Sequence, residues 1–172
     1  HPVIVMALEV MLVNEGYNII SKVDNGVDAI KIIKEKCPNY VILDIGIPKL
    51  DGLEVISRVI NVNSHPKILV FSGQPSDYIV SHCQQLGASG YVSKDSDISE
   101  VILALKTISS GYNFFPQSDF GYSKLDEPGR IKKLSSREIE VLLCLIQGKT
   151  NNEIANSMLL SNKTISTYKK RV

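Results

Sequence analysis

The stretch Tyr40–Gly52, which reads YVILDIGIPKLDG, decides the fold. It opens on the apolar run Val41–Leu43, in which no polar residue alternates, and it closes on a turn that contains proline and glycine. Uninterrupted apolar runs of this length are typical of strands buried on both faces, as in a parallel sheet covered by helices. Because the run ends at Asp44, the stretch predicts a buried strand with a carboxylate at its C-terminal end.

The alternation of strand and helix continues on both sides of this stretch. Turn residues such as Asp24-Asn25-Gly26, Pro48–Gly52 and Gly73-Gln74-Pro75 separate the segments, and Asp97 with Glu100 forms a candidate capping pair. The predicted strands are Tyr17–Val23, Tyr40–Leu43, Ile68–Phe71 and Gly90–Val92. The predicted helices are Val3–Glu15, Val27–Lys36, Leu53–Val62, Tyr78–Leu86 and Ile98–Ser110.

This order predicts an α/β domain over residues 1–110, a doubly wound parallel sheet of five strands. The sequence opens on a helix, so we expect the first of the five strands to precede His1.

The remaining sequence predicts a linker and a small all-α domain. Residues 111–134 contain scattered Gly and Pro, lack periodicity and are interpreted as a linker. Within residues 135–172, Ser135–Glu138 forms a capping box before a helix at Ile139–Gln147, and Gly148 ends that helix. Thr150–Glu153 forms a second capping box before a helix at Ile154–Leu159.

Ser161 is predicted to cap a third helix, which runs to the end of the sequence. Two short helices joined by a turn, the second of them polar and basic, indicate a helix-turn-helix domain. Because the sequence stops while this helix continues, we expect more helix after Val172.

Charge differs between the two parts of the chain. Residues 1–110 hold nine Lys/Arg and twelve Asp/Glu, a balance of −3, whereas residues 111–172 hold ten and six, a balance of +4. A basic second part favours a polyanionic partner there. No apolar run has the length of a membrane span. Cys37, Cys83 and Cys144 are widely spaced and odd in number, which is typical of reduced thiols in a cytoplasmic protein.

Three predicted strands end in residues that can perform chemistry. Asp44 follows the first of them, Ser72 follows Ile68–Phe71, and Lys94 comes shortly after Gly90–Val92. The carboxyl ends of parallel strands form the ligand-binding edge of such sheets. A carboxylate, a hydroxyl and an ammonium at this edge suit phosphoryl transfer, in which a carboxylate oxygen attacks phosphorus and cations neutralise the phosphoryl oxygens. Mg²⁺ prefers oxygen ligands, which the Asp44 carboxylate and the backbone carbonyl of Gly46 can supply.

These motifs resemble the receiver domains of two-component response regulators. Leu43–Pro48 followed by Asp51-Gly52 resembles the family's phosphorylation loop, and Phe71-Ser72-Gly73 and Tyr91–Lys94 resemble its switch hydroxyl and lysine. The resemblance implies that Asp44 accepts the phosphoryl group, that Ser72 and Lys94 contact it, and that Tyr91 is the aromatic switch. His1-Pro2 resembles the segment after the family's acidic pair, so the remaining metal ligands are expected upstream of His1. Asp95 departs from the family's common proline after the lysine.

The second domain resembles the LuxR-type helix-turn-helix of the NarL/FixJ class, and both domains together resemble the BvgA/EvgA branch. The resemblance is carried by Leu134–Leu142 and Leu160–Tyr168. It implies that Ile165 faces the core of the small domain and that base readers and phosphate contacts share the last helix. The predicted base readers are Ser166, Thr167 and Lys170. The predicted phosphate contacts are Lys163, Thr164, Tyr168, Lys169 and Arg171.

Together these observations predict a cytoplasmic transcriptional response regulator and not an enzyme. The implied partners are a sensor histidine kinase or phosphotransfer domain, double-stranded DNA and a second copy of the chain, and the implied cofactor is Mg²⁺; no membrane partner is expected. Two alternatives remain. One is a phosphatase or dehalogenase with Asp44 as nucleophile, disfavoured because Gly46 stands where such enzymes carry a second acid. The other is a phosphorylation-independent DNA-binding protein with a relict receiver.

Overall fold

The computed structural model describes residues 2–61, 66–73, 76–116, 136–158 and 160–170. The chain divides into two compact units, residues 1–119 and 120–172. The first unit holds the predicted α/β domain and the second holds the predicted helical domain. Most of the predicted linker, residues 117–134, lies outside the described residues, so its bounds remain a prediction.

Within the described residues, the sheet of the first unit has three parallel strands in the order β1-β2-β3: β1 Tyr40–Leu43, β2 Lys67–Ser72 and β3 Gly90–Ser93. All three lie where the sequence predicts them. In β2, every residue after Lys67 is buried, as expected for a strand covered on both faces. Phe114 adds a single parallel bridge to Gly90 at the outer edge of β3.

The prediction of a strand at Tyr17–Val23 is wrong. These residues form no ladder in the structure, and the five-stranded sheet is therefore not seen among the described residues. In one common doubly wound order, 2-1-3-4-5, the second strand hydrogen-bonds only to the first. The described residues contain no strand in that first position, so this segment has no backbone partner with which to pair.

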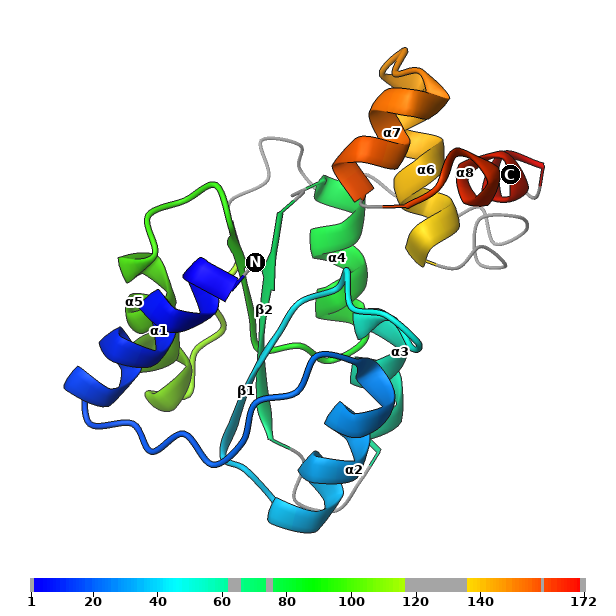
Figure 1. The fold of residues 1–172 in the computed structure, drawn as a ribbon. Helices are drawn as coiled ribbons and strands as arrows, with labels where there is room; N and C mark the ends of the chain where they lie inside the picture. The colour runs from blue at the N-terminus through cyan, green and yellow to red at the C-terminus, as the bar shows by residue number, and fades with distance from the viewer. Residues whose placement is uncertain (1, 62–65, 74–75, 117–135, 159, 171–172) are drawn as a thin grey trace. The chain divides into compact units, whose positions relative to one another are not determined.

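In the part of the first unit that the structure describes, five helices cover the sheet. α1 Pro2–Asn14 and α5 Ser99–Ser109 lie on one face, and α2 Gly26–Lys36, α3 Gly52–Val59 and α4 Asp77–Gln85 lie on the other (Figure 1). The bounds agree with the predicted helices to within a few residues. At the start of α5, the Asp97 carboxylate accepts the N–H of Ser99 and not that of Glu100, and this bond lowers the pKa of Asp97.

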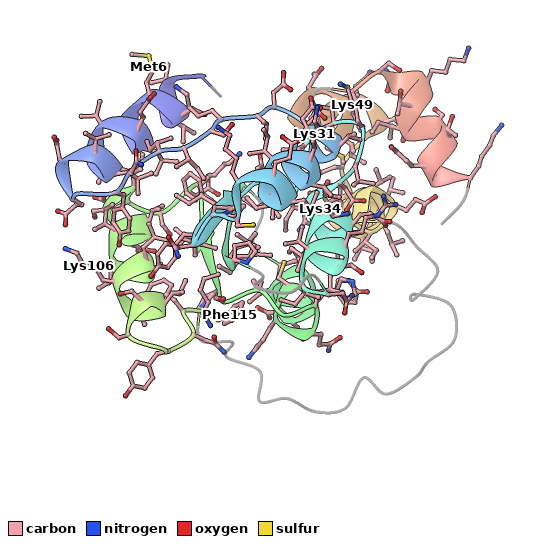
Figure 2. The ribbon with its side chains drawn as sticks, turned by 90° about the horizontal axis from the view of Figure 1, so that it is seen from below. Met6, Lys31, Lys34, Lys49, Lys106 and Phe115 are labelled. Carbon is pink, nitrogen blue, oxygen red and sulfur yellow. The ribbon has the colours of Figure 1, made fainter. Side chains whose placement is uncertain are left out.

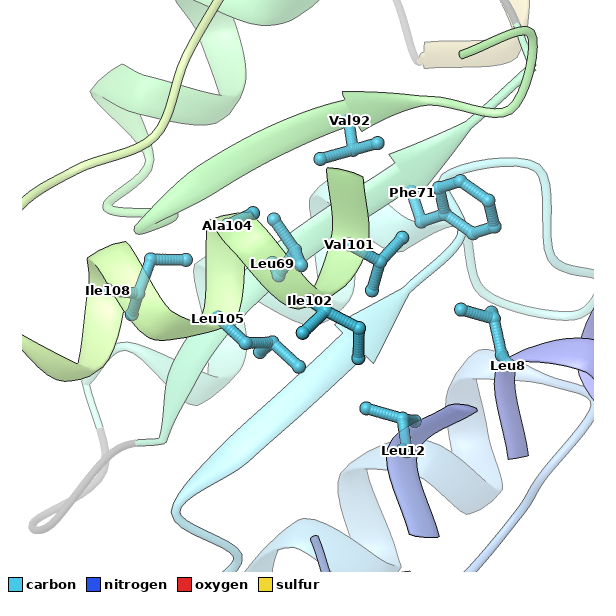
Figure 3. Close-up of a cluster of buried hydrophobic side chains, with 10 residues drawn as sticks. All are labelled: Leu8, Leu12, Leu69, Phe71, Val92, Val101, Ile102, Ala104, Leu105 and Ile108. Atoms are coloured by element: carbon cyan, nitrogen blue, oxygen red, sulfur yellow. The ribbon is translucent and has the colours of Figure 1, made fainter. Parts of the chain in front are cut away.

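One core cluster fills the space between α1, α5 and the sheet. Figure 3 shows Leu8 and Leu12 of α1 facing the α5 side chains, with Leu69, Phe71 and Val92 of the sheet beside them. On the other face, Leu53, Val55, Ile56 and Val59 of α3 and Ile79 and Cys83 of α4 are buried. The strands at the centre are thus held from both sides, which fixes the sheet edge that carries Asp44.

α1 is apolar on its outer side as well. Val3, Met6, Val10 and Val13 are between 57% and 78% exposed. Their spacing of three, four and three residues places them on one stripe of the helix, away from Leu8 and Leu12. Met6 points outward in Figure 2. We call these four side chains the α1 stripe.

Cys37 ends α2 in a left-handed conformation, with φ of 44°, and donates its N–H to Ile33. Side chains with a Cβ are strained there, whereas glycine is not. We expect Cys37→Gly to stabilise the protein by about 1 kcal/mol, measured as a higher urea midpoint at unchanged slope. Cys37→Ala removes the same thiol and keeps the Cβ, so it should give no such gain. Equal midpoints for the two variants would contradict this explanation.

The described residues of the second unit form three helices: α6 Ser136–Ile146, α7 Asn151–Met158 and α8 Asn162–Lys169. Its core contains Val141, Cys144, Ile154, Ala155 and Ile165, all buried. Gly148, with φ of 76°, follows the end of α6 as predicted. Ser135 of the first predicted capping box lies outside the described residues.

Candidate functional site

Strand register brings the three predicted phosphoryl-transfer residues to one edge. Leu43 pairs with Val70, and Ser72 pairs with Ser93. Asp44, Ser72 and Lys94 therefore come at or directly after the C-terminal ends of three adjacent strands. Ser72 is 4% exposed and its carbonyl accepts the N–H of Lys94 at 2.9 Å. The sequence prediction that these residues meet at the sheet edge agrees with this arrangement.

The Asp44 carboxylate is held by two donors. One oxygen accepts the N–H of Gly46 at 3.0 Å, and the other accepts the Lys94 ammonium at 2.5 Å. The Asp44 side chain is 33% exposed and that of Lys94 is 17% exposed. The Lys94 ammonium also lies over the aromatic ring of Phe71, 6.0 Å from its centroid. A partly exposed carboxylate such as Asp44 can attack an electrophile. The Lys94 ammonium beside it can neutralise the negative charge of the product that forms on Asp44.

Gly52 lets the chain return closely to Asp44. A Cβ at this position would lie 2.6 Å from the Asp44 carbonyl oxygen and 2.7 Å from the Ile45 Cα. The N–H of Gly52 donates to the Ile45 carbonyl at 3.0 Å, and Asp51 caps α3 by accepting the N–H of Glu54. These contacts close the loop 44–52 on itself, so the predicted turn Pro48–Gly52 is a tightly fixed segment.

Tyr91 is 1% exposed and lies in β3 opposite Val70. This burial fits a core tyrosine, and the predicted switch role is not tested by it. Asp95, where the family commonly has proline, donates its N–H to the Ser93 hydroxyl at 3.1 Å. Proline has no N–H and cannot make this bond. Aspartate in place of proline therefore adds one hydrogen bond to the loop after Lys94.

Among the described residues, Asp44 and Gly46 are the predicted metal ligands. Asp44 offers a carboxylate. The N–H of Gly46 donates to this carboxylate, so Gly46, whose carbonyl is the second predicted ligand, lies close to Asp44. Among the described residues, no group of three or more His, Cys, Asp or Glu side chains could hold a metal ion. Mg²⁺ sites often combine one or two carboxylates with water and substrate phosphate. The donors present fit part of such a site.

The predicted caps position α7 and α8. The Thr150 N–H donates to the Glu153 carboxylate at 2.7 Å, and the Glu153 N–H donates to the Thr150 hydroxyl at 3.3 Å. Hydrogen bonds from Thr150 hold the pKa of Glu153 below its usual value. The capping box therefore stabilises α7 at neutral pH, and this stabilisation is lost when acidification protonates Glu153. Ser161 caps α8 by accepting the N–H of Thr164. Asn162 also donates to Asn152, which ties the start of α8 to α7.

α8 presents a polar and basic surface. Ile165 is fully buried, as predicted, whereas Ser166, Thr167 and Lys170 are exposed. The hydroxyls of Ser166 and Thr167 donate to carbonyls one turn earlier, those of Asn162 and Lys163, which leaves their oxygens able to accept. Lys163 and Lys169 are exposed as well.

The other predicted phosphate contacts on α8 differ from Lys163 and Lys169 in exposure. Thr164 and Tyr168 are half-buried, and Tyr168 packs against the core of the small domain. Arg171 lies outside the described residues. A shallow hollow of about 290 Å³ borders this surface; Ser161, Lys163, Thr164, Thr167 and Tyr168 line it.

A receiver-like acceptor site and a helix-turn-helix domain in one chain define the class of response regulators that bind DNA. The sequence matches the response regulator receiver domain family over residues 1–106 and the luxR family of bacterial regulatory proteins over residues 132–172. The chain therefore belongs to the two-component response regulators with a LuxR-type DNA-binding domain. It is a transcription regulator and not an enzyme, and the phosphatase alternative is set aside.

Relatives cover the whole chain. The chain is 45% identical to the transcription regulator BvgA of Bordetella pertussis over an alignment of 177 positions, which covers 100% of this chain and 85% of that protein. It is 32% identical to the DNA-binding transcriptional activator EvgA of Escherichia coli K12 over an alignment of 174 positions, which covers 100% of this chain and 85% of that protein. A solved structure of two RcsB dimers bound to two parallel DNAs is 28% identical, covers 99% of this chain and 84% of that chain, and has a TM-score of 0.62. These matches confirm the family predicted from the motifs.

Proposed function

We propose that Asp44 is the phosphoryl acceptor through which a sensor histidine kinase, or its phosphotransfer domain, controls this regulator. The observation that carries the proposal is the Asp44 carboxylate, partly exposed and paired with Lys94 at the sheet edge. A carboxylate oxygen attacks phosphorus, the bond from phosphorus to the donor nitrogen breaks, and the leaving imidazole takes up a proton. Lys94 balances the charge of the new phosphoryl group, and Ser72 is the hydroxyl that moves to contact it. Tyr91 follows as the switch.

A magnesium ion is the cofactor of this proposal. The Asp44 carboxylate and the Gly46 carbonyl would hold it, and it would neutralise charge on the transferring phosphoryl group. The receiver family supports this assignment.

The test uses acetyl phosphate as donor and the mass of the intact protein as readout. We expect a single phosphate adduct in the presence of Mg²⁺ and no adduct when EDTA replaces it. The Asp44 carboxylate and acetyl phosphate are both anions, and their repulsion opposes the reaction unless a cation neutralises it. An equal adduct in EDTA would overturn the magnesium requirement. No adduct under any condition, together with normal DNA binding, would favour the relict receiver.

We further propose that the regulator acts in the cytoplasm as a homodimer that places α8 in the major groove of double-stranded DNA. The exposed Ser166, Thr167 and Lys170 side chains of α8, the luxR family match and the dimeric, DNA-bound RcsB structure support this. The α1 stripe is an exposed apolar surface of the kind that pairs with another chain. No helix among the described residues is long and apolar enough to cross a membrane. The proposed domain bounds are 1–110, 111–134 and 135–172.

A further inference from the structure

The start of α2 touches the loop that follows Asp44. The N–H of Gly26, the first residue of α2, donates to the Pro48 carbonyl at 3.3 Å. The same carbonyl accepts the N–H of Leu50 at 2.8 Å, which closes a three-residue γ-turn around Lys49. Lys49 has a φ of 66°, a rare and strained conformation for a residue with a side chain. Figure 2 labels Lys49 in this turn and Lys31 and Lys34 on α2.

The contact is backbone against backbone. A Cβ on Gly26 would lie 2.1 Å from the Leu50 carbonyl oxygen and 2.9 Å from the Leu50 carbonyl carbon. Only glycine therefore allows α2 to begin here. The first N–H groups of a helix have no partner within the helix, and in α2 one of them is used to hold the strained turn.

Asn25 fixes the place at which α2 begins. Its side chain accepts the N–H of Asp28 at 3.0 Å and donates to the carboxylates of Asp24 and Asp28 at 2.9 and 2.6 Å. Asn25 is 3% exposed, and it is one of the buried polar side chains of the described residues, as Ser72 is. The Asn25 amide is therefore buried and held by three hydrogen bonds, unlike the amide of a solvated turn residue. Because Gly26 directly follows Asn25, these bonds also set the position of Gly26.

We infer that Asn25 and Gly26 are positioning residues for phosphoryl transfer at Asp44, an inference that rests on the proposed function. Asn25 holds the first turn of α2, Gly26 holds the Pro48 carbonyl, and the loop 44–52 is closed at its other end by Gly52 on Ile45. The segment Asp44–Gly46, which carries the nucleophile and the metal-binding carbonyl, is thereby kept in one conformation. Neither residue touches the phosphoryl group.

The test compares Asn25→Ala with Asn25→Ser, which restores a capping oxygen. With acetyl phosphate as donor, two quantities are measured: the second-order rate of adduct formation and the Mg²⁺ concentration that gives half of the maximal rate. Asn25→Ala should lower the rate on the order of tenfold and raise the Mg²⁺ requirement severalfold. Asn25→Ser should recover most of both losses. Ile108→Val, a mild core truncation in α5, is the matched control and should change neither.

Native values of both quantities in Asn25→Ala would overturn the inference, as would an equal change in Ile108→Val. If Asn25→Ala does not fold, Asn25→Gly serves, because glycine is tolerated at this cap but lacks the amide. Asp44→Asn separates this inference from the function on which it rests. If Asp44→Asn takes up no phosphate while Asn25→Ala keeps the native rate and Mg²⁺ requirement, the positioning role alone is rejected. Continued uptake by Asp44→Asn would reject the acceptor itself.

Discussion

Asp44→Asn is expected to abolish phosphate uptake from acetyl phosphate, with a rate at least about a thousandfold below that of the unchanged protein. The amide keeps the shape of the side chain and can still lie between Gly46 and Lys94, but it has no anionic oxygen to attack phosphorus. The same variant should fold normally, because Asp44 is partly exposed and its neighbours remain in place. Adduct formation is followed by intact mass, and folding by thermal unfolding.

Asp95→Asn is the matched control for this variant. Asp95 is an exposed aspartate directly after Lys94, and the tie it makes to Ser93 uses its backbone N–H. Its substitution also removes one carboxylate near the site, yet uptake should stay close to native. An Asp44→Asn protein that takes up phosphate at the native rate would contradict the assignment of the acceptor.

Lys170→Ala is expected to weaken binding to the preferred DNA site by about 1–3 kcal/mol and to reduce discrimination between sequences. Lys170 lies one turn after Ser166 and donates its N–H to the Ser166 carbonyl, so both side chains project from the same part of α8. Lys169→Ala should instead weaken all DNA by a similar factor and reduce the salt dependence by about one unit of slope. A phosphate contact adds affinity without sequence information.

Binding of both variants to a specific and a scrambled duplex, over a range of salt concentrations, separates these roles. The two lysines are adjacent and both exposed, so general loss of positive charge is the same in each. Identical effects of the two substitutions on both duplexes would reject the division between base reading and phosphate contact.

Local patterns predicted much of the fold. The strands at Tyr40, Ile68 and Gly90 are continuous apolar runs, and the Thr150–Glu153 box was visible as a sequence motif that the structure then formed through reciprocal hydrogen bonds. The strand predicted at Tyr17–Val23 failed for a non-local reason. Whether an extended segment joins a sheet depends on a partner strand beside it, and residue pattern alone does not report that partner.

The site was predicted in part. Asp44 and Lys94 could be found because each comes shortly after an apolar run, and parallel strands share one functional edge. Asn25 and Gly26 were interpreted only as a turn, because their contact with Pro48 and Leu50 joins segments more than twenty residues apart. The available signal was a glycine at the first helical position directly after an asparagine cap, an unusual choice where most residues would serve.

The measurement that tests the central claim most directly is the affinity for a specific duplex before and after phosphorylation with acetyl phosphate and Mg²⁺, in the unchanged protein and in Asp44→Asn. If Asp44 controls the DNA-binding domain, phosphorylation should change the affinity of the unchanged protein by roughly 5- to 150-fold, the usual range of coupling between two sites. Asp44→Asn should show no change. Equal affinity of the phosphorylated and unphosphorylated protein, or the same response in Asp44→Asn, would contradict the account.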